Sequence, residues 1–253
     1  ILKFICLFGI TFSLLIITAN AEELKENSWR YKNGIPIQTE ESDSNELYSF
    51  ATPTMKGIDV SKHQGVINWD SVYGNIDYAI IRCGYGNDDI TQDDSQWYNN
   101  ANACTRLGIP FGVYIYSYAQ SVSQAKSEAK HVLRLVENHK LNFPIYLDVE
   151  EDDQAKLSKS KLTDIINTFV TEIHNQGYEV GIYANLNWWT NYIDKSVASN
   201  QTWFKWVAQY NNIGTTYTGV YQMWQCSDKG TVSGIRGKVD LNFWFDKVTV
   251  RLY

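Results

Sequence analysis

The sequence predicts an α/β fold in which eight short strands close into a barrel. The chain has 253 residues, 44% of them hydrophobic, which suits one large domain and excludes a disordered or collagen-like chain. Short apolar runs recur along it, several of them followed by a longer amphipathic stretch. Strands that are joined by helices pair in parallel through right-handed crossovers, and such a sheet can close into a barrel.

Residues 1–21 have the pattern of a secretory signal peptide that is cleaved after Ala21. An apolar run covers 4–17, and the small residues Ala19 and Ala21 then supply a signal peptidase site. An uncleaved membrane anchor is the alternative interpretation, but the apolar run is shorter than the roughly 20 residues that span a bilayer. We therefore expect an exported mature chain, with no stable membrane insertion after cleavage.

Residues 22–54 are expected to form a polar leader or linker, and residues 55–253 the barrel, as a single domain. The leader has no periodic apolar residues and carries most of the acidic excess of the chain. With 22 basic and 28 acidic residues, the chain lacks the polycationic surface that binds phosphate backbones. We expect a monomer with no nucleic-acid partner.

The strand candidates are eight short, mostly apolar runs at 57–61, 78–83, 111–116, 144–150, 179–183, 206–210, 221–225 and 239–243. Helical periodicity, with apolar residues three and four positions apart, is found at about 94–108, 121–139 and 158–176. The later connections are polar, aromatic or glycine-containing and lose this periodicity at 188–202, 211–220 and 226–238. The sequence therefore predicts a barrel whose last strands lack a regular layer of helices.

The cysteines and histidines indicate neither a zinc site nor a closed disulfide framework. Cys6 leaves with the predicted signal peptide, which leaves Cys83, Cys104 and Cys226. A disulfide between Cys83 and Cys104 requires the strand of one to lie against the helix of the other, and buried free thiols are the alternative. No metal-ligand spacing is present among the four histidines, His63, His131, His139 and His174.

Acidic residues stand at the strand ends where barrels of this kind carry function. Asp59 ends the first predicted strand, Asp148 and Glu150 end the fourth, and Asp240 lies on the eighth. The first and eighth strands are neighbours in a closed barrel, and the fourth lies across its mouth. We therefore expect four carboxyl groups to converge on one cleft.

Asp148 and Glu150 are two positions apart, so they share one face of a strand with α-carbons roughly 6.5–7 Å apart. Crowded, partly buried carboxyls differ in pKa, and some keep a proton at neutral pH. Cleavage of a glycosidic bond requires this difference, because one group protonates the leaving oxygen while another stabilises or attacks the sugar carbon. A helix cap or loop anchor is the alternative for a single aspartate, and a divalent-metal site for the cluster.

The chain contains 9 Trp, 17 Tyr and 10 Phe, more than an ordinary core uses. A flat-faced ligand such as a sugar is one explanation, and an aromatic-rich core is the other. The same two explanations apply to Trp188 and Trp189, which form either a sugar platform or a packed loop.

Seven motifs in order resemble glycoside hydrolase family 25, the muramidases often called Chalaropsis-type or phage and bacterial lysozymes. They are KGIDVSKHQG at 56–65, IRCGYG at 81–86, GVY at 112–114, LDVE at 147–150, GIYAN at 181–185, WVAQY at 206–210 and GKVDLN at 237–242. The resemblance covers about 56–246. Residues 221–226 match the late Trp- and Gln-rich strand of the family only loosely, so we predict no catalytic residue there.

The resemblance implies roles for the four acids. Glu150 matches the general acid/base of the family, and Asp148 matches the aspartate that orients the acetamido group of the substrate or polarises its neighbour. Asp59 and Asp240 match the acids that complete the cleft, and Asp240 is a candidate for stabilising the oxocarbenium-like centre. Substrate-binding positions near the sugar are matched by Tyr85, Tyr114, Tyr183 and Trp206, of which Tyr114 and Tyr183 could instead fill the barrel.

The fold that the resemblance implies is a TIM-like irregular (β/α)5(β)3 barrel. The implied function is a secreted lysozyme that acts outside the cell or in the cell wall. It would hydrolyse the β-1,4 bond between N-acetylmuramic acid and N-acetylglucosamine in peptidoglycan glycan strands, without metal or organic cofactor. The alternatives are a hydrolase of another N-acetylated glycan such as chitin, and a non-catalytic glycan-binding barrel. Four intact carboxyls argue against the binding protein, because binding needs no proton donor.

Overall fold

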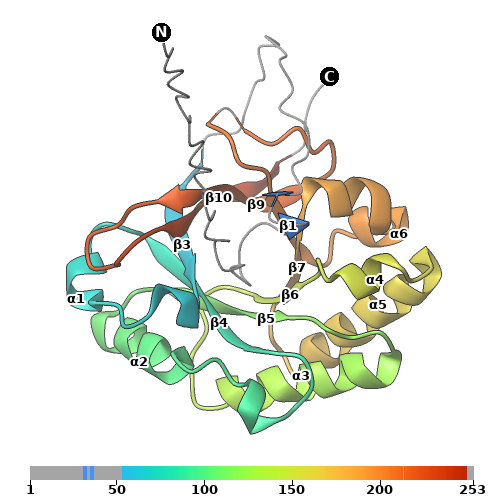
Figure 1. The fold of residues 1–253 in the computed structure, drawn as a ribbon, viewed down its shortest axis with the longest axis horizontal. Helices are drawn as coiled ribbons and strands as arrows, with labels where there is room; N and C mark the ends of the chain where they lie inside the picture. The colour runs from blue at the N-terminus through green and yellow to red at the C-terminus, as the bar shows by residue number, and fades with distance from the viewer. Residues whose placement is uncertain (1–30, 33–34, 37–52, 213, 250–253) are drawn as a thin grey trace, which may run out of the picture.

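Eight strands form a closed barrel in the computed structural model of the chain (Figure 1). The structure describes residues 31–32, 35–36, 53–212 and 214–249. The predicted signal peptide and most of the predicted leader therefore lie outside the described residues. Within the leader, β1 (Tyr31–Lys32) and β2 (Ile35–Pro36) form a short antiparallel pair.

All eight predicted barrel strands are confirmed. Most ends shift by one to three residues, but the last two strands continue five and six residues beyond their predicted ends, so part of the loop predicted at 226–238 is strand. They are β3 (Met55–Val60), β4 (Tyr78–Tyr85), β5 (Phe111–Tyr116), β6 (Ile145–Asp148), β7 (Val180–Asn185), β8 (Phe204–Ala208), β9 (Tyr221–Gly230) and β10 (Val239–Thr249). Their order around the barrel is β10-β3-β4-β5-β6-β7-β8-β9. This is an irregular α/β barrel of the predicted class.

The three predicted helices are confirmed as α2 (Trp97–Leu107), α3 (Val122–Val136) and α5 (Lys159–Asn175). Both longer helices begin at a serine cap: Ser121 accepts from the Gln124 amide at 3.3 Å, and Ser158 from the Lys161 amide at 3.2 Å. Single turns complete the connections: α1 (Trp69–Val72), α4 (Asp152–Ala155), α6 (Lys195–Ala198), the 3-10 turns η1 (Lys62–Gln64) and η2 (Ile90–Gln92), and the π-helical turn η3 (Trp188–Tyr192).

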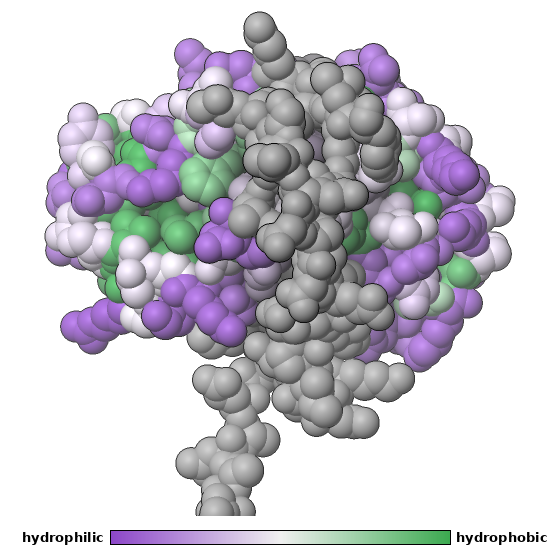
Figure 2. Space-filling model, turned by 90° about the horizontal axis from the view of Figure 1, so that it is seen from above, coloured by the Kyte–Doolittle hydropathy of each residue, from purple (hydrophilic) through white to green (hydrophobic). Residues whose placement is uncertain are grey.

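Helices cover the barrel unevenly, as the loss of periodicity predicted. In Figure 1 they surround the lower and right sides, whereas β9 and β10 cross the top without a helical layer. The molecule viewed from above shows hydrophobic side chains mainly as patches between hydrophilic ones (Figure 2). Within the described residues, we find no helix with the length and apolar character needed to cross a membrane.

Our expectation of parallel pairing throughout is wrong for the last strand. Neighbouring strands from β3 to β9 pair in parallel, but β10 runs antiparallel to both β9 and β3. The connection between β9 and β10 covers only residues 231–238, and so short a link joins antiparallel strands. The reversal brings the start of β10, rather than its end, to the edge where the other strands finish.

The barrel interior is filled by an aromatic cluster that includes Tyr78, Tyr114, Tyr146, Tyr183 and Trp206. Glycines make room for two of these rings: a Cβ at Gly57 would lie 2.4 Å from the Tyr78 ring, and one at Gly181 would lie 2.5 Å from the Tyr146 ring. The abundance of aromatic residues is therefore explained in large part by the core.

A larger apolar layer lies between the strands and the helices, and it contains Trp188 and Trp189. Both indoles are buried, and the Trp189 Nε1 donates to the main-chain oxygen of Trp206. These tryptophans form a packed loop and not a sugar platform. The same layer contains the buried free thiols of Cys83 and Cys104, so the disulfide that we considered is not formed.

Candidate active site

The four predicted acids are buried at the edge of the barrel where the parallel strands end. Asp59 lies near the end of β3, and Asp148 is the last residue of β6. Glu150 follows two residues later, and Asp240 is the second residue of β10. Each is at most 3% exposed. Burial of a carboxyl raises the free energy of the folded state unless charges or hydrogen bonds compensate it. Clusters of buried acids are therefore typical of functional sites.

The strand that carries the acidic pair is shorter than predicted. We expected it to include Glu150, but β6 ends at Asp148. The main chain still follows β7 for one more residue, because the Val149 amide donates to the Tyr183 carbonyl at 2.9 Å. Glu150 therefore stays at the barrel mouth beside Asp148, although it belongs to the loop.

The phenol of Tyr114 lies among three of the acids. Burial raises the pKa of Tyr114 well above its usual value of 10. The guanidinium of Arg82 opposes this shift, while the carboxyls of Asp59, Asp148 and Asp240 add to it. Such effects require these groups to be near one another, since the interaction of two charges falls with distance.

Tyr183 joins the fourth acid to this group. Burial raises the pKa of its phenol, and the charges of Glu150, Asp148 and Asp59 add to the effect. Tyr114 and Tyr183 thus have Asp59 and Asp148 as common neighbours. The structure brings all four acids together around these two buried tyrosines.

Asp59 and Asp240 form a directly opposed pair. They are cross-strand partners in the register of β3 and β10, and their side chains are hydrogen-bonded to each other. Burial raises the pKa of Asp59 to about 6. The pKa of Asp240 is raised well above its usual value, first by burial and then by the charge of Asp59. The two carboxyls thus share one hydrogen bond, and the neighbouring charge of Asp59 disfavours ionisation of Asp240.

Two side-chain amides complete the surroundings of Asp59. The Asn242 Nδ2 and the Gln225 Nε2 both donate to the Asp59 Oδ2, at 2.7 and 2.8 Å. Asn242 lies on β10 and Gln225 on β9, and both are fully buried. Sequence reasoning missed both residues. The available signal was an amide in an otherwise apolar strand, which needs hydrogen-bond partners when buried.

The oxygen atoms of these amides are fixed from the other side by aromatic donors. The Trp206 Nε1 donates to the Asn242 Oδ1 at 2.8 Å. The hydroxyls of Tyr183 and Tyr210 donate to the Gln225 Oε1 at 2.9 and 3.1 Å. Because each amide oxygen is occupied in this way, each amide nitrogen is directed at Asp59.

Comparison with known proteins identifies the family. The model of the glycosyl hydrolases family 25 matches residues 58–235, more than half of the chain. The chain belongs to glycosyl hydrolase family 25. This confirms the family that the motifs indicated. The match begins within β3 and extends past β9, and the seventh motif at 237–242 follows directly after it.

Several known proteins are similar to this chain over about three quarters of its length. The autolytic lysozyme of Clostridium acetobutylicum is 26% identical over 203 residues, which cover 78% of this chain and 57% of that protein. The modular autolysin LytC from Streptococcus pneumoniae, solved with a synthetic peptidoglycan ligand, matches with a TM-score of 0.65 and 29% identity, over 76% of this chain and 46% of LytC. The chain thus spans about half the length of these two proteins.

A single-barrel relative gives the same result. The bacterial lysozyme from Streptomyces coelicolor matches with a TM-score of 0.66 and 26% identity, over 77% of this chain and 93% of that one. The closed eight-stranded barrel is therefore the fold of family 25 lysozymes, as the sequence predicted.

The predicted substrate-binding residues fall into two groups in the family 25 barrel. Tyr114, Tyr183 and Trp206 are at most 4% exposed and belong to the interior cluster. Tyr85, at the end of β4, is only half-buried, and its ring contacts that of Tyr118 edge-on at 6.3 Å. Tyr118 is 38% exposed, so the accessible aromatic surface at this edge is formed by Tyr85 and Tyr118.

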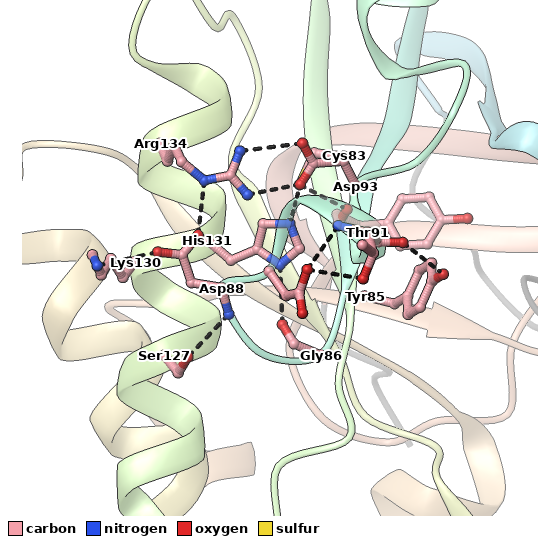
Figure 3. A network of polar contacts seen from close by, with 12 residues as sticks. Cys83, Tyr85, Gly86, Asp88, Thr91, Asp93, Ser127, Lys130, His131 and Arg134 are labelled. Carbon is pink, nitrogen blue, oxygen red and sulfur yellow. Dashed lines mark hydrogen bonds and ion pairs between the residues drawn. The ribbon is translucent and has the colours of Figure 1, made fainter.

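A polar network holds the loop that follows β4 against α3 (Figure 3). Arg134 donates to Asp93 through both terminal nitrogens, at 2.7 and 3.2 Å, and to Asp88 through Nε at 2.7 Å. The buried ring of His131 contacts the Asp93 Oδ1 at 2.8 Å and the Gly86 carbonyl at 3.1 Å. Bidentate contacts of this kind fix geometry, so the loop next to Tyr85 is firmly positioned.

Of the four histidines, His131 on α3 has this structural role. Across the described ranges, no group of three or more His, Cys, Asp or Glu side chains is arranged to hold a metal ion.

Proposed function

We propose that this chain is a muramidase that hydrolyses the β-1,4 bond between N-acetylmuramic acid and N-acetylglucosamine in peptidoglycan. The observation that carries the proposal is the convergence of four buried carboxyls at the mouth of a family 25 barrel. Relatives named as lysozymes, and LytC with its peptidoglycan ligand, support this substrate.

Glu150 is the general acid in this mechanism. Its side chain is longer than that of Asp148, and its place beyond the end of β6 lets it reach over the glycosidic oxygen. It protonates that oxygen as the bond to the sugar carbon breaks, and it then accepts a proton from the incoming water. Glu150 therefore begins the reaction protonated and returns to that state.

Asp148 orients the acetamido group of the substrate. It lies two residues before Glu150 on the same segment and is set back into the barrel as the last residue of β6. The positive charge that develops on the sugar carbon requires a nearby anion, and the cluster around Tyr114 and Tyr183 supplies it.

The glycan is bound against the accessible tyrosines. Tyr118 offers a partly exposed ring that suits the apolar side of a sugar, and Tyr85 stands edge-on to it with the Lys62 Nζ 5.1 Å from its own ring centroid. The segments that carry the two tyrosines are held to α3, through Arg134 to Asp93 after β4 and through Glu128 to the Tyr118 amide after β5. Tyr114 lines the floor of the site. Replacement of Tyr85 by Ala is expected to raise KM more than it lowers kcat when initial rates of peptidoglycan hydrolysis are measured against substrate concentration.

Export to the cell wall follows from residues 1–21, whose pattern is that of a signal peptide. Peptidoglycan lies outside the membrane, so an exported mature chain meets its substrate directly. We propose that the enzyme acts as a monomer in the extracellular space or the wall.

Analysis of digestion products tests the activity. Purified peptidoglycan is digested, the new reducing ends are reduced with borohydride, and the fragments are analysed by mass spectrometry. We expect N-acetylmuramic acid at every new reducing end. New ends of N-acetylglucosamine, or activity confined to chitin, would contradict the proposal and favour a hydrolase of another N-acetylated glycan. Binding without any product would favour the glycan-binding barrel.

A further inference from the structure

The aspartate pair at the junction of β3 and β10 has unequal surroundings. Asp59 accepts two amide hydrogen bonds on one oxygen, from Asn242 and Gln225. Within the described residues, no amide contact of this kind is found on Asp240, which instead shares its hydrogen bond with Asp59. Amide N–H groups can only donate, and they stabilise a carboxylate more than a carboxylic acid.

We propose that Gln225 and Asn242 are positioning residues that keep Asp59 the ionised member of the pair, while Asp240 retains the shared proton. Asp59 then supplies the fixed negative charge of the site, and Asp240 directs its proton at Asp59. This reverses the expectation that Asp240 is the anion which stabilises the oxocarbenium-like centre. The role in turnover rests on the proposed muramidase function, but the order of ionisation does not.

The aromatic residues of the interior set the orientation of both amides. Rotation of the Asn242 amide would place its NH2 against the indole N–H of Trp206, and rotation of the Gln225 amide would place its NH2 against the hydroxyls of Tyr183 and Tyr210. The indole N–H can only donate, so the first rotation opposes two donors, and either rotation would set an amide oxygen against the Asp59 carboxylate in a buried site, which is strongly unfavourable. Tyr183 and Trp206 thus fill the barrel and also orient the two amides.

Several other ionisable side chains face the aspartate pair. They are four phenols and two carboxyls. Around Asp59 stand the phenols of Tyr78, Tyr114, Tyr183 and Tyr210, and around Asp240 the carboxyls of Glu150 and Asp228. Burial raises the pKa of all four phenols, so they stay neutral. The charge of Asp228, and that of Glu150 whenever Glu150 has given up its proton, make ionisation of Asp240 still less favourable.

The test is a direct titration of both aspartates. The carbon-13 resonances of the side-chain carboxyls are followed by NMR against pH in the full chain, and Asp59→Asn and Asp240→Asn assign the two signals. We expect Asp59 to ionise at lower pH than Asp240. In Asn242→Leu and in Gln225→Met, the titration of Asp59 should move to higher pH by about one to two units, since each variant removes a hydrogen bond to a charged group.

A matched control is available on the same strand. Gln222 is also a buried glutamine of β9, but its side chain accepts from the main-chain amide of Lys205 at 2.9 Å. Gln222→Met should leave the titration of Asp59 unchanged. Should Asn242→Leu fail to fold, Gln225→Met removes the other amide hydrogen bond to the same Asp59 oxygen and tests the proposal by itself.

Kinetics provide the second measurement. The acidic limb of the pH profile of kcat/KM should shift upward with the titration of Asp59 in both amide variants, and activity should recover toward that of the wild type near pH 8. A purely structural defect lowers activity equally at all pH values. Ionisation of Asp240 before Asp59, or an unchanged titration of Asp59 in both variants, would overturn the inference. If NMR shows the expected order but peptidoglycan is not cleaved, the proposed function alone has failed.

Discussion

At the scale of single residues, the site depends on which carboxyl carries a proton. The four acids were identified from their positions at strand ends, and the structure buries them together. Their division of labour follows from different neighbours: amides face Asp59, a carboxyl faces Asp240, and Glu150 stands beyond the end of its strand. Environment, and not residue type, separates their chemical roles.

Glu150→Gln is expected to lower kcat by roughly 10²-fold or more, because it removes the general acid. The fold and glycan binding should be nearly unaffected, since Gln has almost the same shape. Steady-state rates on purified peptidoglycan between pH 4 and 8, with thermal melts of the same samples, measure both effects. Asp148→Asn should also impair turnover, through loss of orientation and charge.

Glu151→Gln is the matched control for this prediction. Glu151 is the next residue, is only half-buried, and accepts from the Tyr116 hydroxyl at 3.1 Å. Its replacement should reduce kcat far less than that of Glu150. Near wild-type turnover of Glu150→Gln with an unchanged pH profile would transfer the role of acid to one of the aspartates.

At the scale of elements, a buried carboxyl joins α3 to the end of β5. Glu128 on α3 accepts from the Ser117 hydroxyl at 2.7 Å and from the Tyr118 amide at 2.8 Å. Burial raises the pKa of Glu128 to about 7, although these hydrogen bonds partly oppose the shift. The segment with Tyr118 is therefore attached to α3 through a group that titrates near neutrality.

This attachment makes stability depend on pH. The pKa of Glu128 is higher in the folded chain than the value of 4.5 expected when unfolded. Between these two pKa values the folded chain holds a proton on Glu128 that the unfolded chain has lost. The contribution is fully present below about pH 4.5 and is lost as pH rises through about 7. The pKa of Asp59 is also raised, to about 6, so its contribution to stability is likewise lost as pH rises. We expect the melting temperature to fall between pH 5 and 8.

Glu128→Gln should remove part of this dependence, because an amide is neutral at every pH. Between pH 5 and 8, titration of Glu128 should lower the free energy of unfolding of the wild type by up to about 3 kcal/mol. The variant lacks this part of the decrease. Melts at a series of pH values test this, with the exposed Glu137→Gln as control. Parallel wild-type and variant curves would show that Glu128 does not titrate in this range.

At the scale of the whole molecule, the barrel is closed by one reversed strand. Parallel strands with crossover helices continue as far as β7, and the last three strands close the sheet without them. Reversal of β10 places Asp240 opposite Asp59 and Asn242 within reach of the same carboxylate. A parallel eighth strand would have put the start of that strand at the other end of the barrel.

The mature chain is expected to begin at Glu22, after removal of residues 1–21. Expression of the whole sequence in a bacterial host, followed by N-terminal sequencing of the protein recovered outside the cytoplasm, measures this directly. A variant with Arg at both Ala19 and Ala21 should block cleavage and serves as the control. An intact N-terminus in the membrane fraction would favour the uncleaved anchor instead.

The sequence alone was sufficient to predict the eight strands, the three longer helices and the four acids. Each of these is encoded locally: apolar periodicity depends on which face of an element is buried, and acids at the ends of apolar strands stand out against their neighbours. The order of seven motifs was enough to indicate the family. The predicted signal peptide and most of the predicted leader lie outside the described residues, so these predictions remain untested.

Only the tertiary structure decided the direction of β10, the free state of Cys83 and Cys104, and the burial of Trp188 and Trp189. It also decided that Gln225 and Asn242 meet at Asp59 from two different strands. The physical reason is that periodicity records burial but carries no information on strand direction, and hydrogen bonds between distant segments depend on the register in which the closed sheet pairs them.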